Sequence, residues 1–369
     1  MRNRADLVGG LIRLAAVVVL GTTALGASFM IVAPGSTSAA AAASESGEPA
    51  MLRGANISGG DFGKIPGTYG TDYTYPTEAE VAYYARAGFN ALRVPFLWER
   101  VQHDVNGALD QTNDGSGDFD RVRELVGWIT QRGMVAILDV HNYARRKVDG
   151  ETRMVGSKEL PAAALSDLWL RLSEAFKDNE RVWFGLMNEP YDISADAWKA
   201  IAQTVTNDIR ASGARNKILV PGTSYSGAHS WVSSGNAEAM ASFTDPADNF
   251  AFDIHQYLDA DSSGRSGTCV AGAGASRLSP FVEWAKSAPG RKGFLSEFAA
   301  GDPSVAGQEQ CASELKALLD AAESSGVFIG WTAWGGGPWW QPSYIFRLEP
   351  ADLDGPATNY MRLLRQRIN

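Results

Sequence analysis

Two glutamates stand where apolar runs give way to polar loop residues. Glu189 ends the run Phe184-Gly185-Leu186-Met187-Asn188-Glu189, and Glu297 ends Gly293-Phe294-Leu295-Ser296-Glu297. Each run is typical of a buried strand, and barrel enzymes place their reacting groups at the ends of such strands. One carboxyl group can donate a proton while the other attacks carbon or activates water. A pair of this kind is the minimum equipment for cleaving a glycosidic bond.

The composition is that of a folded protein. The chain has 369 residues, of which 45% are hydrophobic and 20% charged, so it is long enough to bury a large core. Its formal net charge is -9, and its lysines and arginines form no long run. A nucleic-acid backbone needs a basic surface, so we do not expect a nucleic-acid partner.

The first 43 residues have the pattern of a secretory signal. Three early arginines precede an uncharged stretch from Leu14 to Val32, and small residues with many alanines follow as far as Ala43. We expect cleavage in this region, which would make the protein extracellular or periplasmic. Because the uncharged stretch is long, an uncleaved membrane anchor is the alternative, and a membrane partner is expected only in that case. Residues 44–50 are then a short linker, and residues 51–369 a single catalytic domain.

The chain contains two cysteines, Cys269 and Cys311. In an oxidising compartment an even count favours a disulfide, so we expect these two to be joined; two buried free thiols are the alternative. Neither cysteine has a cysteine or histidine neighbour at metal-ligand spacing. No glycine-rich dinucleotide or phosphate loop is found either, so the sequence predicts neither a metal nor a cofactor.

Apolar runs and helical patterns alternate through the chain from Leu52 onward. The runs are mostly continuous rather than alternating, as expected of strands buried on both faces; they span 52–58, 89–96, 134–141, 182–188, 217–221, 250–257, 292–297 and 327–334. Apolar residues at three-to-four spacing predict helices over 77–87, 120–131, 162–177, 195–211, 280–287 and 308–324. This order predicts an α/β fold, a (β/α)8 TIM barrel. Longer inserts follow the first, third and sixth strands.

Further polar and aromatic residues fall at the same strand ends. They are Arg93, His141, Asn188, His255, Tyr257 and Trp334. Two of the four histidines of the chain are among them. A charged side chain within an apolar strand is costly unless it is paired, so Arg93 needs a buried carboxylate, and Glu297 is the expected partner.

Several motifs, taken in order, resemble glycoside hydrolase family 5, and within it the endo-β-1,4-glucanase (cellulase) type. They are Gly67-Thr68-Tyr69-Gly70-Thr71-Asp72-Tyr73, Leu92-Arg93-Val94-Pro95, Asp139-Val140-His141-Asn142-Tyr143, Asn188-Glu189-Pro190, Gly227-Ala228-His229-Ser230-Trp231, Asp253-Ile254-His255-Gln256-Tyr257, Ser296-Glu297-Phe298 and Trp331-Thr332-Ala333-Trp334. The resemblance covers the chain from Arg53 to its C-terminal helix. In the fifth-strand segment the family leads us to expect a tryptophan where this chain has Tyr225.

The resemblance implies a retaining hydrolase of internal β-1,4-glucosidic bonds. Glu189 would be the proton donor and later the base, and Glu297 the nucleophile, with the two carboxyl groups about 5 to 5.5 Å apart. Among the supporting residues, Arg93 and Tyr257 would hold Glu297 ionised, Asn188 would bond the sugar 2-hydroxyl, and Trp334 would lie under the cleaved sugar. His141 and His255 would contact sugar hydroxyls and Glu189.

Substrate and role stay open at this point. The partner expected is a β-glucan polysaccharide, and the protein is expected to be a monomer. The same fold could instead act on mannan, xyloglucan or mixed-linkage glucan, because substrate choice depends on loop residues that the motifs do not fix. A non-hydrolytic polysaccharide-binding or assembly protein is the alternative from another functional class.

Overall fold

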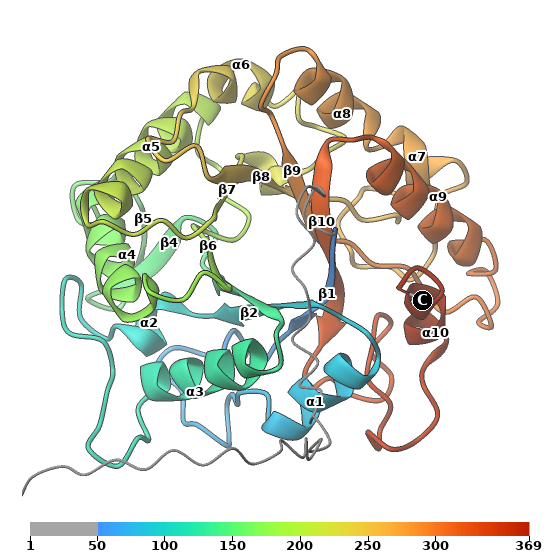
Figure 1. Cartoon of the computed structure of the whole chain (residues 1–369), viewed down its shortest axis with the longest axis horizontal. Helices are drawn as coiled ribbons and strands as arrows, with labels where there is room; N and C mark the ends of the chain where they lie inside the picture. The colour runs from blue at the N-terminus through green and yellow to red at the C-terminus, as the bar shows by residue number, and fades with distance from the viewer. Residues whose placement is uncertain (1–50, 369) are drawn as a thin grey trace, which may run out of the picture. The chain divides into compact units, whose positions relative to one another are not determined.

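The computed structural model describes residues 51–368, and these form a closed parallel barrel surrounded by helices (Figure 1). The barrel strands are β1 (Leu52–Ile57), β2 (Ala91–Phe96), β3 (Val135–Val140), β6 (Val182–Gly185), β7 (Ile218–Pro221), β8 (Phe250–His255), β9 (Gly293–Glu297) and β10 (Phe328–Gly336). Their order around the barrel is β1-β10-β9-β8-β7-β6-β3-β2, and every neighbouring pair is parallel. The predicted (β/α)8 fold is confirmed.

Helices fill the connections between strands. The longer ones are α1 (Glu78–Arg86), α3 (Asp118–Gln131), α4 (Ala162–Phe176), α5 (Ala195–Ala211), α8 (Ser279–Lys286), α9 (Cys311–Ser324) and α10 (Asn359–Arg365). Short turns of helix are α2 (Trp98–Val101), α6 (Asn236–Ala239) and α7 (Ala273–Ser276), with 3-10 turns at Ser224–Ser226 and Met240–Ser242. The helix α5 is an example of an amphipathic helix with a side-chain cap. The Ser194 side chain caps its first turn, and Trp198, Val205 and Ile209 are buried on one face.

The interior of the barrel is filled by alternate residues of the strands. A small apolar cluster of Ala91, Val135, Ile137, Leu219, Ala251 and Phe294 packs there, separate from the larger core that contacts the helices. Side chains two residues apart point to the same face of a strand. The inward positions that follow Ala91, Ile137 and Ala251 toward the carboxyl ends are therefore Arg93, Asp139 and Asp253, so the apolar interior becomes polar at one end.

The insert after the third strand contains a hairpin where no element is predicted from the sequence. Strands β4 (Arg145–Val148) and β5 (Glu151–Met154) form an antiparallel hairpin. Its two-residue turn is Asp149-Gly150, with φ values of 52° and 82°. An Asp-Gly pair suits this type of turn because both central residues need positive φ, so the signal was present in the sequence.

Strand β6 is shorter than expected and ends at Gly185 rather than at 188. Leu186 and Asn188 still donate backbone hydrogen bonds to Leu219 and Val140, and the chain turns at Glu189, whose φ of 43° a strand residue cannot have. The expected disulfide joins Cys269 and Cys311, and it ties the insert after β8 to the first residue of α9.

The predicted signal or anchor over residues 1–43 and the linker over 44–50 lie outside the described residues. Within residues 51–368, none of the helices has the length and apolar character needed to span a membrane.

Candidate active site

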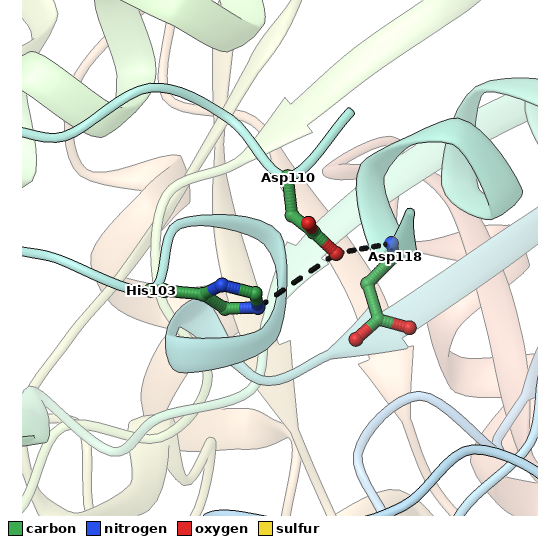
Figure 2. A group of neighbouring side chains, drawn as sticks. All are labelled: His103, Asp110 and Asp118. Carbon is green, nitrogen blue, oxygen red and sulfur yellow. Dashed lines mark hydrogen bonds and ion pairs between the residues drawn. The ribbon is translucent and has the colours of Figure 1, made fainter. Parts of the chain in front are cut away.

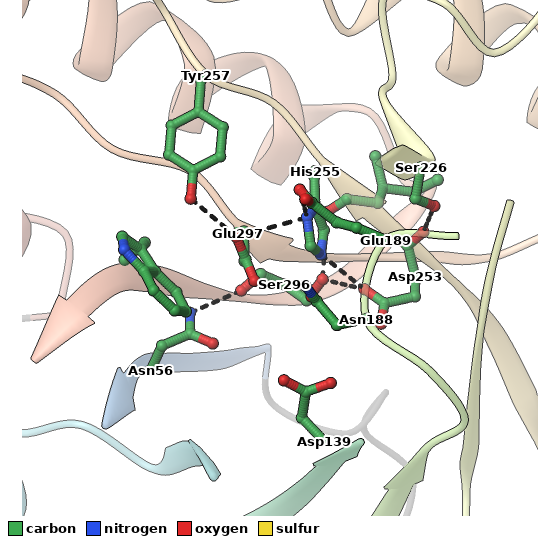
Figure 3. A network of polar contacts seen from close by, with 12 residues as sticks. Asn56, Asp139, Asn188, Glu189, Ser226, Asp253, His255, Tyr257, Ser296 and Glu297 are labelled. Carbon is green, nitrogen blue, oxygen red and sulfur yellow. Dashed lines mark hydrogen bonds and ion pairs between the residues drawn. The ribbon is translucent and has the colours of Figure 1, made fainter. Parts of the chain in front are cut away.

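Both glutamates singled out by the sequence lie at the carboxyl ends of barrel strands, with His255 between them (Figure 3). One oxygen of Glu189, one oxygen of Glu297 and a ring nitrogen of His255 all lie within 4.8 Å of one another. Glu297 is the last residue of β9, His255 the last of β8, and Glu189 follows β6. The barrel therefore brings together three residues that are far apart in the sequence.

Glu297 is held by a set of hydrogen-bond donors. Its Oε1 accepts a 2.7 Å hydrogen bond from Nη1 of Arg93, and its Oε2 accepts a 2.8 Å bond from the Tyr257 hydroxyl. Burial alone would raise the pKa of Glu297, but the charges of His255 and Arg93 outweigh it and bring that pKa below its usual range. Glu297 is therefore kept ionised, as a nucleophile must be.

Glu189 is in a different environment. Its Oε1 lies 2.7 Å from Nδ1 of His255, and its side chain is the more exposed of the two. Burial raises the pKa of Glu189 above its usual range, although the hydrogen bond from His255 acts in the opposite direction. Two neighbouring carboxyl groups with pKa values moved apart can divide the roles of acid and nucleophile between them.

Arg93 is fully buried and makes the predicted ion pair with Glu297. It also donates 2.8 Å hydrogen bonds to Asn56 and Asn188, and its Nη2 lies 3.0 Å from Asp139 Oδ1. Neither Asn56 nor Asp139 is among the site residues predicted from the sequence. Asp139 could have been noticed, because it is a carboxylate inside the continuous apolar run of β3 (Val135–Val140) and therefore needs a buried cation.

A wall of the site is built from His141, Asn188 and Trp334. His141 Nδ1 lies 2.7 Å from Asp139, while its Nε2 lies 3.2 Å from Asn188 Nδ2. The imidazole is stacked on Trp334 with 5.5 Å between ring centroids, and the indole nitrogen of Trp334 donates to the Tyr344 hydroxyl at 2.8 Å. Each of the predicted supporting residues thus lies in one connected network around Glu189 and Glu297.

A cleft of about 710 Å³ opens beside Glu189. Its lining includes His255 and Tyr257 together with residues absent from the predicted set: Tyr143, Tyr191, Tyr225, His229 and Arg265. Tyr225, which replaces the tryptophan expected from the family, stacks on Tyr191 with 4.8 Å between ring centroids. Half of the Tyr225 side chain is exposed, so an aromatic surface is still present at that position.

Two clusters in residues 51–368 have donor sets that could hold a cation. One is Glu189, His255 and Glu297 itself, and the other is His103, Asp110 and Asp118 (Figure 2). In the second, Asp110 accepts a hydrogen bond from the Asp118 backbone nitrogen, and the Asp118 carboxylate accepts one from Tyr73. Arg121 lies 3.7 Å from the same carboxylate, and these contacts explain the cluster as part of the local packing.

A closed (β/α)8 barrel that holds two carboxylates this close together, beside an aromatic-lined cleft, defines a glycoside hydrolase of the retaining kind. The match to known families is more specific. The cellulase family, glycosyl hydrolase family 5, matches residues 43–337. The chain belongs to this family.

Individual relatives agree with that assignment. Endo-β-1,4-glucanase B of Emericella nidulans is 36% identical over 304 residues, which cover 81% of this chain and 86% of the relative. An endo-β-1,4-glucanase structure from Xanthomonas axonopodis pv. citri is similar with a TM-score of 0.79 and 41% identity, over 86% of this chain and 98% of that one. The structure of XacCel5A in complex with cellopentaose has a TM-score of 0.78 and 42% identity, over 86% of this chain and 99% of that one.

Proposed function

We propose that this protein is an endo-β-1,4-glucanase that hydrolyses internal β-1,4-glucosidic bonds with retention of configuration. The observation that carries the proposal is the close approach of Glu189 and Glu297, whose nearest oxygens lie within 4.8 Å. Inverting enzymes need about 6.5 to 9.5 Å between their carboxyl groups to admit a water molecule, and retaining enzymes about 5 to 5.5 Å. The names of the relatives and their cellopentaose complex support the choice of a β-glucan.

In the first step, the Glu297 carboxylate attacks the anomeric carbon as Glu189 donates its proton to the leaving glycosidic oxygen. The bond between that oxygen and the anomeric carbon breaks, and a glycosyl ester of Glu297 forms. In the second step Glu189, now a carboxylate, takes a proton from water. The resulting hydroxide attacks the anomeric carbon and releases Glu297.

The neighbouring residues support these steps. Arg93 and Tyr257 orient Glu297 and stabilise its charge through the bonds at 2.7 and 2.8 Å. Asn188, which accepts a hydrogen bond from Arg93, would bind the sugar 2-hydroxyl, and Trp334 would offer an indole surface to the sugar at the cleavage site. In this proposal His255 orients Glu189, which it contacts, and His141 binds sugar hydroxyls.

The test is the release of reducing ends from carboxymethylcellulose, β-mannan, xyloglucan and barley β-glucan, with the anomer of the first product followed by NMR. Glu189→Gln and Glu297→Gln should each lower the rate on carboxymethylcellulose by at least about 10²-fold. Glu174→Gln is the matched control, because that side chain is 72% exposed and outside the site. Faster cleavage of β-mannan or xyloglucan would replace β-1,4-glucan as the assigned substrate. Folded protein without activity on any polymer would favour a binding or assembly role.

We propose that the first 43 residues direct export of the protein. Residues 51–369 then form the catalytic domain, and the active protein is a monomer. The disulfide between Cys269 and Cys311 supports an oxidising compartment. N-terminal sequencing of the protein recovered from the producing cells tests the proposal. A start near residue 44 in the medium or periplasm indicates cleavage, whereas Met1 in the membrane fraction indicates an anchor.

A further inference from the structure

A second hollow lies beside the cleft, between the loop that follows β1 and the hairpin formed by β4 and β5. Its volume is about 370 Å³, and its charged lining residues are Lys64, Glu99, Arg145, Arg146 and Lys147. We call it the cationic groove. Four of these five side chains are basic, although the chain as a whole has a formal net charge of -9.

The single carboxylate of the groove does not neutralise the basic side chains directly. Oε1 of Glu99 accepts a 2.7 Å hydrogen bond from the Lys147 backbone nitrogen, and Oε2 accepts a 2.8 Å bond from the Asn142 side chain. Glu99 therefore holds the hairpin in place through neutral donors. Its charge is still present, so the lining has a net positive charge rather than four uncompensated cations.

Two of the basic residues have carboxylate partners at the surface. Lys64 lies 3.6 Å from Asp72, and Arg145 lies 3.2 Å from Asp192, whose side chain is 76% exposed. Pairs of this kind are weak because water screens them, and a better placed anion can replace the partner.

The other two basic residues bond to main-chain carbonyls. Lys147 Nζ donates to the Ile65 carbonyl at 3.1 Å, and Arg146 Nη2 donates to the carbonyl of His103 at 2.8 Å. Arg146 is only 3% exposed, and its Nη1 has no hydrogen-bond partner among residues 51–368. Neither residue forms an ion pair with a carboxylate in that part of the chain. The buried Arg146 guanidinium instead lies over the Trp98 ring, 4.9 Å from its centroid, so its charge is met by an aromatic face and main-chain carbonyls rather than by a carboxylate.

The cationic groove adjoins the cleft beside the catalytic pair. Tyr143 and Tyr191 line both hollows, and Arg145 lies over the Tyr191 ring at 3.7 Å from its centroid. The groove also reaches His141, which faces Asn188 at the centre of the site. A group attached to a sugar that is bound beside Tyr143 and Tyr191 would therefore lie next to the groove while the glucan backbone stays in the cleft.

We propose that the cationic groove binds an anionic substituent, a carboxylate carried on the β-1,4-glucan chain, and so favours acidic glucans over neutral ones. The inference rests on the proposed function and adds the substrate class. A carboxylate in the groove would accept hydrogen bonds from Lys147 and Lys64 and would lie in the field of Arg146. The size of the groove accommodates a short acidic side group beside the main chain.

The experiment compares carboxymethylcellulose with hydroxyethylcellulose of matched chain length and degree of substitution. The measured quantity is the ratio of kcat/KM for the acidic polymer to that for the neutral one. Lys147→Met and the double variant Lys64→Met/Lys147→Met keep the side-chain length and remove charge. Each lost charge should lower the ratio about two- to five-fold, the size expected of an ion pair at a partly exposed site. Activity on hydroxyethylcellulose should stay the same.

Lys286→Met is the matched control, because Lys286 is an exposed lysine at the end of α8 and lies outside the groove. It changes the net charge equally and should leave the ratio unchanged. Raising the salt concentration should lower the ratio of the wild type more than that of the double variant, since salt screens exposed charges. If neither groove variant changes the ratio, or if a variant lowers the activity on both polymers equally, the inference is wrong while the glucanase function stands. A wild type that cleaves neither polymer overturns both.

Discussion

Nδ1 of His255 lies 2.7 Å from Oε1 of Glu189, and the same nitrogen lies 3.5 Å from Oε2 of Glu297. One imidazole thus faces both carboxylates of the site. Burial would lower the pKa of His255, but Glu297 and Glu189 outweigh it and raise that pKa to about 9. As a cation, His255 helps to keep Glu297 ionised, while burial keeps the pKa of Glu189 raised. The two carboxyl groups therefore differ although they share a neighbour.

The pH dependence of activity should be bell-shaped. Activity requires Glu297 ionised and Glu189 protonated. Because the pKa of Glu297 is lowered, activity should persist to a pH below the usual range of a glutamate and fall when Glu297 takes up a proton. Because the pKa of Glu189 is raised, the fall at high pH should begin above that range. The measurement is kcat/KM on a soluble cello-oligosaccharide across pH, and a profile that keeps rising with pH would contradict the assignment of Glu189 as the acid.

Tyr257→Phe should move only the acidic limb of that profile. The Tyr257 hydroxyl donates to the charged form of Glu297, so its loss should raise the pKa of Glu297 by about one unit or more, since a hydrogen bond to a charged group contributes about 1.5 to 3 kcal/mol. The acidic limb moves to higher pH and the active range narrows. Tyr360→Phe is the control, because that hydroxyl bonds the Phe298 carbonyl rather than a carboxylate. An unchanged acidic limb in Tyr257→Phe would show that the hydroxyl does not tune Glu297.

Removing the disulfide should lower stability without removing activity. Cys269 and Cys311 are 42 residues apart, and closing a loop of that size stabilises by about 4 kcal/mol in the chain-entropy model. Cys269→Ser/Cys311→Ser should therefore unfold at lower denaturant concentration, measured by tryptophan fluorescence in guanidinium chloride. Wild-type protein under reducing conditions serves as the comparison and should approach the double variant. Equal midpoints for the variant and the oxidised wild type would contradict this expectation.

Arg210→Met tests a buried ion pair far from the cleft. Arg210 on α5 donates to Asp245 at 2.7 and 2.8 Å, and both side chains are almost fully buried. Removing the cation leaves Asp245 buried without its partner, which should cost about 3 to 5 kcal/mol of the free energy of unfolding. The catalytic constants of the remaining folded protein should not change. Asn at position 245 removes the charge and keeps an oxygen for the backbone nitrogens of Ala247 and Asn249, so Arg210→Met/Asp245→Asn should recover part of the loss. No recovery would show that the unpaired charge of Asp245 is not the cause of the loss.

Much of the fold could be predicted from local patterns. The strands β2, β3 and β8 were found within one or two residues of their observed bounds, because continuous apolar runs mark strands that are covered on both faces. The end of β6 was predicted less well. Its apolar run continues to Met187, but the chain turns at Glu189, and hydrophobicity does not record a change of backbone direction.

The supporting residues were harder to predict from sequence alone. Arg93 was expected to need a carboxylate, yet Asn56 and Asp139, which it also contacts, were not singled out. Each looks like an isolated polar residue in a strand. Only the register of neighbouring strands, in which Asn56 pairs with Arg93 and Pro95 pairs with Asp139, shows that they share one site.

The sequence by itself determined which chemical groups are available and the order of strands and helices, since both depend on residue type and short-range periodicity. The tertiary structure decided which groups meet. Arg93 and Glu297 are 204 residues apart, and the closed barrel brings them to 2.7 Å. The cationic groove arises in the same way, because the loop that contains Lys64 and the hairpin that contains Lys147 are adjacent only in the folded chain. Distances of this kind depend on barrel closure and strand register, which no local pattern in the sequence specifies.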